Sequence, residues 1–199
     1  MTLSGGNVKG QVQGGFTAKN DAVSNVVTID GGTVDLYVAG GRSNSGNALD
    51  NEVVVRSGQV TQYVVGGYTE RNGDANGNRV TVTGNAAVTG EIIGGYSGGV
   101  GTATNNTVTL TPDAGVNYAT SIVYGGQSMG GGEARVGNTL NVNSSALEVK
   151  DIVNFETVNL NFSRGTIPLP GDAVLTLNSQ TGSDLRDTVV NAFGEIAGG

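Results

Sequence analysis

The apolar and polar residues of the chain alternate in a pattern that recurs five times before Asn143. In residues 51–67 (NEVVVRSGQVTQYVVGG) apolar side chains occupy every second place at Val53 and Val55, and a second apolar strand follows a short turn. Alternation with a period of two predicts half-buried β-strands. A helix is excluded because no stretch keeps a helical period over three turns, and Gly, Val, Thr and Asn all disfavour helix.

Each copy of the pattern ends in two glycines, with a branched aliphatic residue two positions earlier. The pairs are Gly14-Gly15, Gly40-Gly41, Gly66-Gly67, Gly94-Gly95 and Gly125-Gly126. Successive pairs lie 26, 26, 28 and 31 residues apart, and self-similarity at this period is typical of stacked repeat architectures. We expect these glycines at the corners of a coil, where the chain adopts a positive φ or runs close to the neighbouring coil.

A polar loop follows each glycine pair and leads to an Asn that opens the sequence Asn-x-apolar-x-apolar. These residues are Asn25, Asn51, Asn78, Asn106 and Asn138. Each Asn shares the face of the apolar residues that follow it, because alternate residues of a strand point to one side. We therefore expect each Asn at a corner, with its amide hydrogen-bonded to the Asn of the coils above and below.

A single repeat cannot bury its few inner apolar side chains alone. Stacking the repeats about 4.8 Å apart would pair their backbones and align like residues into ladders. The sequence thus predicts an all-β fold: a right-handed parallel β-helix, or β-solenoid, with coils of about 26–31 residues.

The regular repeats occupy residues 1–142, and we expect 143–199 to be irregular, diverged C-terminal coils or a cap of the same solenoid. Leu175, Leu177 and Val189 mark later strands in that part. Pro168 and Pro170 mark a loop, because proline cannot donate to a central ladder.

Composition limits the chemistry. The sequence contains no histidine and no cysteine, so imidazole and thiolate sites are excluded, and we predict no catalytic residue, no metal ligand and no cofactor. A polysaccharide-cleaving enzyme would need acids that converge on neighbouring coils, whereas the aspartates fall in or beside turns. With 17 acids, 10 scattered bases and a net charge of −7, the chain has no basic stripe for nucleic acid.

An aromatic residue directly follows the glycine pair in three copies, at Phe16, Tyr68 and Tyr96, whereas Arg42 and Gln127 take this place in two others. We favour a ladder of rings packed on the edge of the core. A carbohydrate-stacking platform is the alternative.

Threonines recur at outward positions of the Asn-containing strands. One outward column is Thr28, Val54, Thr81, Thr109 and Asn141, and its neighbour is Val26, Glu52, Arg79, Thr107 and Thr139. Ice binding needs a flat, regular double array of threonine, which these two columns do not supply. The preference of threonine for strands explains the pattern better.

The repeats resemble the passenger region of bacterial autotransporter-type surface proteins over about residues 5 to 162. The similarity lies in units of the kind V-x-G-G, polar loop, N-x-V-x-V, as in residues 38–55, and in the segment 154–160 (NFETVNL). It implies a β-helix exported to the bacterial cell surface, where passengers serve as adhesins, aggregation factors, enzymes or stalks. No signal peptide and no stretch of transmembrane length is recognisable, so we expect a segment of a longer protein without membrane insertion.

The leading functional hypothesis is a non-enzymatic, extracellular stalk or adhesin segment. Its polar loops would contact a host or bacterial surface glycan or protein. The alternative is a self-assembling subunit of an extracellular filament, joined end to end by solenoid stacking or strand exchange. A polysaccharide-binding or polysaccharide-cleaving β-helix is the third hypothesis.

Overall fold

A computed structural model of the chain describes residues 1–144, 146–161 and 173–193. The predicted loop at Pro168 and Pro170 lies outside these residues. These described residues contain β-strands and no helix, and the strands form three sheets. The prediction of an all-β parallel β-helix is confirmed.

Each coil contributes one strand to each of two long sheets. Sheet A contains, in spatial order, β1 (Thr2–Val8), β4 (Val26–Val34), β7 (Glu52–Val60), β9 (Arg79–Gly84), β12 (Thr107–Pro112), β14 (Thr139–Val142), β16 (Thr157–Asn161) and β18 (Val189–Phe193), with β10 (Ala87–Val88) paired to β7. Sheet B contains β2 (Val12–Thr17), β5 (Tyr37–Ser43), β8 (Tyr63–Thr69), β11 (Glu91–Ser97), β13 (Tyr118–Ser128), β15 (Leu147–Val153) and β17 (Leu175–Leu177). The short sheet C pairs β3 (Ala22–Val23) with β6 (Ala48–Leu49).

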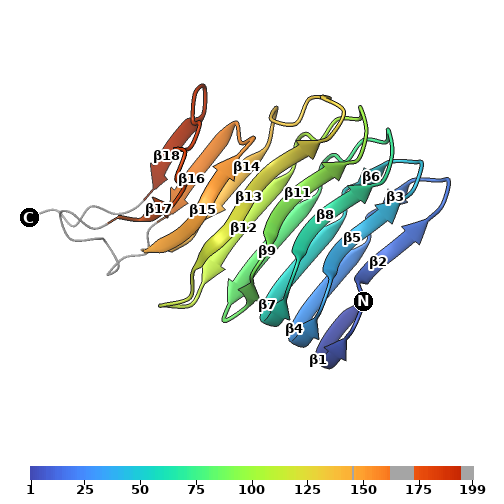
Figure 1. The fold of residues 1–199 in the computed structure, drawn as a ribbon, viewed down its shortest axis with the longest axis horizontal. Helices are drawn as coiled ribbons and strands as arrows, with labels where there is room; N and C mark the ends of the chain where they lie inside the picture. Colours follow the sequence, from blue (N-terminus) through green and yellow to red (C-terminus); the bar gives the residue numbers. More distant parts are fainter. Residues whose placement is uncertain (145, 162–172, 194–199) are drawn as a thin grey trace, which may run out of the picture.

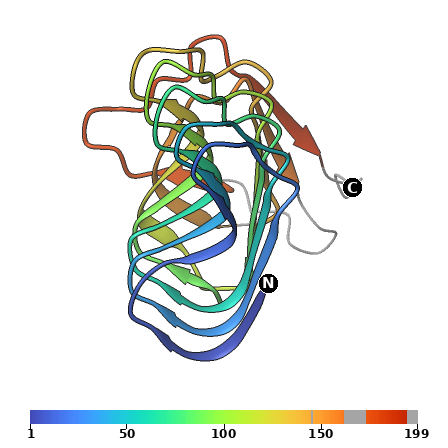
Figure 2. The same ribbon diagram turned by 90° about the vertical axis from the view of Figure 1, so that its right-hand side faces the viewer.

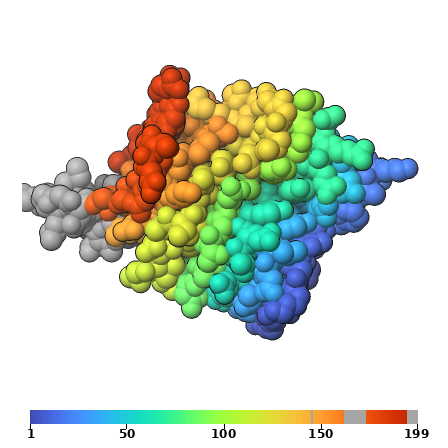
Figure 3. All heavy atoms as spheres, in the orientation of Figure 1, coloured from blue at the N-terminus to red at the C-terminus, as the bar shows by residue number. Residues whose placement is uncertain are grey.

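The pairing is parallel, and it joins each repeat to the next, as Val53 of β7 lies between Val27 of β4 and Val80 of β9. The sequence therefore advances along the stack from one end to the other (Figure 1), and the coils overlie one another when the view is turned (Figure 2). In the space-filling view the coils form successive bands across the molecule (Figure 3).

The core lies between sheets A and B and consists of columns of aliphatic side chains. One column of sheet A is Val27, Val53, Val80, Val108, Leu140 and Val158. The facing column of sheet B is Val12, Val38, Val64, Ile92, Val123 and Ile152. All twelve side chains are buried, so the apolar face that one coil cannot cover is closed by its neighbours.

The later strands continue the same sheets. β15 and β17 extend sheet B, and β16 and β18 extend sheet A in parallel register. The fifth repeat carries extra residues that shift the register between Tyr118 and Ile122. Tyr118 fills this part of the core, 1% exposed, and its hydroxyl donates to the carbonyl oxygen of Ala86 at 3.4 Å.

Truncating a core column should destabilise the whole stack. Leu110→Ala removes a fully buried side chain, and we expect the free energy of unfolding to fall by about 2–5 kcal/mol. Val100→Ala, at an exposed loop position, should change it by less than about 0.5 kcal/mol. Chemical unfolding of both variants measures the difference, and equal effects would contradict this account of the core.

Candidate functional surfaces

The five predicted Asn residues lie one above another inside the solenoid, each directly before a strand of sheet A. The Nδ2 group of each donates to Oδ1 of the next, at 2.9 Å from Asn25, 3.1 Å from Asn51 and Asn78, and 3.2 Å from Asn106. The backbone N–H of each donor residue reaches the same oxygen at 2.8–3.0 Å.

The ladder leaves Asn51 and Asn78 no free N–H group for a ligand. The second N–H of Asn51 donates to the carbonyl oxygen of Ala22 and that of Asn78 to the carbonyl oxygen of Ala48, each in the preceding coil and each at 2.9 Å. Asn51, Asn78, Asn106 and Asn138 are fully buried. Because a buried amide is costly unless it is hydrogen-bonded, this ladder is a structural device that joins the coils.

The paired glycines lie inside strands, so their expected place at corners is wrong, whereas the expected close approach to the neighbouring coil is found. All ten lie inside strands β2, β5, β8, β11 and β13, and none has a positive φ. Glycine is required at these positions because neighbouring atoms leave no room for a Cβ. A Cβ at Gly15, Gly41 or Gly67 would lie 2.5 Å from Cγ of the Asn of the same repeat, and a Cβ at Gly40 or Gly66 would meet the carbonyl oxygen of the next glycine pair.

The sequence analysis did not predict a column of Ser and Thr residues, although one of them follows every glycine pair. Ser or Thr stands two positions after the second glycine, at Thr17, Ser43, Thr69, Ser97 and Ser128. The hydroxyls of Ser43, Ser97 and Ser128 donate to carbonyl oxygens of the loops at 2.8–2.9 Å. This column holds the start of each polar loop against the neighbouring loop.

The polar loops themselves are stacked. The backbone N–H of Asp74 donates to Oδ1 of Asn47 at 2.9 Å, and that of Thr102 donates to Oδ1 of Asp74 at 2.7 Å. The backbone N–H of Ala48 donates to the carbonyl oxygen of Asp74, and that of Ala75 donates to the carbonyl oxygen of Thr102, both at 2.8 Å. Many of the side chains expected to contact a partner are thus used to build a third wall of the solenoid.

The predicted aromatic residues Phe16, Tyr68 and Tyr96 lie on the outer face of sheet B, in register with Arg42 and Gln127. Three tyrosines that the sequence analysis did not select join the same surface: Tyr37, Tyr63 and Tyr124. Tyr37 and Tyr63 stand three positions before a glycine pair, so an alignment of that position would have found them. We call the six aromatic residues and Arg42 the aromatic face.

The rings of the aromatic face stack on one another along the solenoid. The ring centroids of Tyr37 and Tyr63 are 4.7 Å apart, and those of Tyr68 and Tyr96 are 4.9 Å apart, with the planes 4° from parallel in both pairs. The guanidinium of Arg42 lies between Phe16 and Tyr68, 5.4 and 5.6 Å from their centroids. These contacts occupy ring faces that a sugar would need, which favours the ladder over the carbohydrate-stacking platform.

Beneath the rings lies a small apolar cluster of Ala39, Val65 and Ile93, each at most 3% exposed. Burial is the main cause that raises the pKa of Tyr63, Tyr96 and Tyr124 above the ordinary range, and for Tyr63 the neighbouring Tyr68 and Tyr37 add to it. The phenols of these three residues are therefore neutral hydrogen-bonding groups at physiological pH.

The outward columns of sheet A follow the predicted register. Thr28, Val54, Thr81, Thr109 and Asn141 are consecutive partners, and so are Val26, Glu52, Arg79, Thr107 and Thr139. A third column, outside the two considered in the sequence, begins with Thr83 and Thr111.

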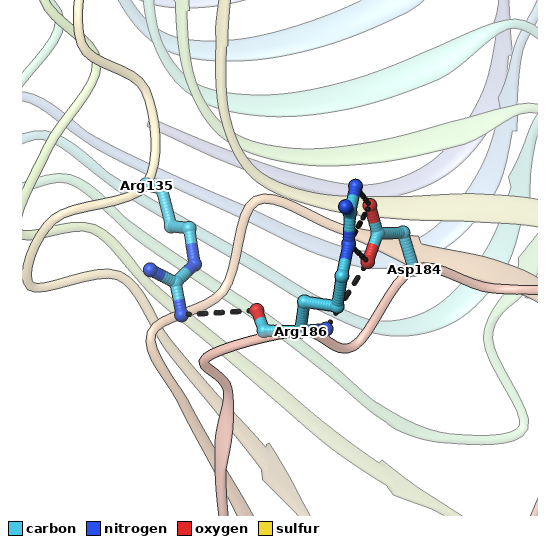
Figure 4. Close-up of polar contacts among 3 residues, drawn as sticks. All are labelled: Arg135, Asp184 and Arg186. Atoms are coloured by element: carbon cyan, nitrogen blue, oxygen red, sulfur yellow. Dashed lines mark hydrogen bonds and ion pairs between the residues drawn. The ribbon is translucent and has the colours of Figure 1, made fainter.

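A cleft of about 430 Å³ lies between the turn 151–155 and the loop 182–188. Figure 4 shows that Arg135 reaches across to the backbone of this loop, where it donates to the carbonyl oxygen of Arg186. It also donates to the carbonyl oxygen of Asp187. Arg186 forms a bidentate pair with Asp184 (Figure 4), which lowers the pKa of Asp184 to about 2. Both guanidinium groups are thus engaged within the chain.

Within residues 1–144, 146–161 and 173–193 there is no group of three or more His, Cys, Asp or Glu side chains placed to hold a metal ion. The same residues contain no helix that is long and apolar enough to cross a membrane. Comparison of the chain with protein-family models, curated proteins and solved structures gives no match.

Gly67 and the amide of Asn78 face each other, so substitutions at these two positions should be energetically coupled. Gly67→Ala places a methyl group against the amide of Asn78, and we expect a cost of about 1–3 kcal/mol. In an Asn78→Ala background the same change should cost less, with a coupling energy above about 1 kcal/mol. Gly10→Ala, which meets no atom within 4 Å, is the control, and simple additivity in a double-mutant cycle would refute the contact.

Stability should fall in alkali because buried tyrosines must ionise. Burial raises the pKa of Tyr63 and Tyr118, so above about pH 10 the unfolded chain releases phenolic protons that the folded chain retains. The free energy of unfolding then decreases as pH rises. Tyr63→Phe and Tyr118→Phe should each make this decrease shallower in urea titrations, and an unchanged slope in both variants would be inconsistent with the assignment.

Proposed function

We propose that the chain is a non-enzymatic segment of an extracellular surface protein, a β-solenoid stalk that also acts as an adhesin. Contact with the partner, a surface protein, is made through the aromatic face of sheet B. The observation that carries the proposal is the aromatic face itself, which crosses neighbouring coils on a scaffold with a continuous core.

The composition of this face supports a protein partner. Tyrosine and arginine are enriched at protein interfaces and dominate their binding energy. Five of the six aromatic residues are tyrosines, which present apolar rings together with a polar hydroxyl, and stacking holds four of these rings in place. Ordered rings lose little conformational entropy on binding, which favours affinity.

The scaffold supports the role of a stalk. Its buried column Val27, Val53, Val80, Val108 and Leu140 continues through five consecutive coils, and the Asn ladder runs beside it. The absence of histidine and cysteine from the sequence removes the commonest nucleophile–base pairs. Both features agree with a protein that positions a surface rather than transforms a substrate.

Adhesion of beads coated with the chain tests the proposal. Coated beads should bind epithelial or bacterial cells, and the double variant Tyr68→Ser/Arg42→Ser should reduce binding by about tenfold or more, since it removes two residues of the kinds that dominate interfaces. Thr28→Ser, on the outer face of sheet A, is the control.

Treatment of the target cells identifies the partner class. Protease treatment should abolish adhesion, whereas glycosidase treatment should leave it. Adhesion that equals that of uncoated beads, or that survives in the double variant, would overturn the proposal. Beads that bind only one another would instead favour the homotypic assembly considered above.

A further inference from the structure

The outer face of sheet A carries a block of nine uncharged polar side chains, eight on the adjacent strands β12, β14 and β16 and one, Asn143, directly after β14. We call it the Thr/Asn lattice; it contains Thr107, Thr109, Thr111, Thr139, Asn141, Asn143, Thr157, Asn159 and Asn161. All nine are partly exposed. Thr81 and Thr83 on β9 and Asn191 on β18 continue its columns.

Hydrogen bonds between neighbouring strands fix the asparagines of the lattice. The Nδ2 group of Asn159 donates to Oδ1 of Asn141 at 2.9 Å, and Asn191 donates to Asn159 at 3.0 Å. In the adjacent column Asn161 donates to Asn143 at 2.7 Å, and Asn143 donates to Oγ1 of Thr111 at 3.0 Å. The solenoid therefore has an outer amide ladder as well as the buried one.

The outer ladder differs from the buried one in its free capacity. An Asn amide offers two N–H donors and two acceptor positions. At Asn159 the ladder uses one donor and one acceptor position, and its partly exposed side chain leaves the others for a ligand. The threonines contribute hydroxyls on side chains that are stiff at χ1. The lattice is thus ordered before any ligand arrives, which reduces the entropic cost of binding.

The geometry specifies the ligand. The polar groups repeat about every 4.8 Å across the strands and about every 6.7 Å along each strand, so a ligand with a repeating structure can bond to many of them at once. Free N–H donors and free acceptors lie side by side, which suits hydroxyl groups because a hydroxyl both donates and accepts. None of the nine side chains carries a charge, so a charged polymer finds no ionic partner there.

From these features we propose that the Thr/Asn lattice binds a neutral polysaccharide. The site is separate from the aromatic face, which lies on sheet B, and it needs none of the residues assigned to protein contact. Ice is another uncharged, periodic ligand, but of the two columns weighed for it in the sequence one is interrupted by Val54 and the other contains Glu52 and Arg79. The lattice begins only at β12, and five of its positions are threonine and four are asparagine.

Retention of the purified chain on insoluble polysaccharides tests this proposal. Cellulose, chitin and a linear β-1,3-glucan serve as neutral probes, and pectate serves as the charged probe. We expect retention on at least one neutral probe, little retention on pectate, and no weakening by added salt, because no ion pair contributes.

Two variants at the centre of the lattice report on the site. Asn141→Lys introduces a charge and Asn141→Leu removes the amide at similar size; each should lower retention by about tenfold. Thr28→Lys and Thr28→Leu, in the same outward column but on β4, are the matched controls and should bind as the unchanged chain does. Thermal unfolding of all four variants shows that they are folded, and the Leu variant keeps the test valid where the Lys variant fails to fold.

Three outcomes would overturn the proposal: no retention on any neutral probe, retention on pectate alone, or equal retention by the Asn141 variants and the unchanged chain. Shaping of ice crystals without retention on a polysaccharide would also overturn it. Because bead adhesion is measured with variants on sheet B, failure of that experiment and failure of this one are distinguishable.

Discussion

A buried side-chain amide that only the next coil can satisfy is the constraint on which this solenoid depends. Each ladder Asn needs an acceptor for its Nδ2 group and for its backbone N–H, and both bonds go to one oxygen in the following repeat. A shift of register by one residue would leave these groups buried without partners, at a cost of about 1–3 kcal/mol for each. The ladder thus fixes how every coil sits on its neighbour.

The glycine pairs follow from the same constraint. Sheet B passes so close to the Asn side chains that a Cβ at Gly41 or Gly67 would overlap the amide. Glycine is therefore required by packing against the opposite strand and not by backbone conformation at these places. The Gly-Gly pair and the Asn about ten residues later recur together because they pack against each other in every repeat.

Parallel stacking also turns repeated residues into surfaces. On sheet B, one outward position per repeat produces stacked tyrosines and an arginine between rings. On sheet A, the same register produces charge in the early coils and uncharged amide and hydroxyl columns in the later ones. One scaffold thus presents two outer faces of different chemistry, and either face can change by substitution without disturbing the valine core.

The sequence by itself determined the β-helix, the inner valine columns and the position of the Asn residues, because each depends on a period of two within a strand and of about 26–31 residues between coils. It misplaced the glycines, since the distance between opposite sheets is not encoded in a local pattern. It also left out Tyr37, Tyr63 and the amide columns of Asn141 and Asn143. The repeat alignment places these residues in columns, but only the tertiary structure decided that the rings stack and that the amides hydrogen-bond, because both depend on the side-chain geometry that the stacked backbones impose.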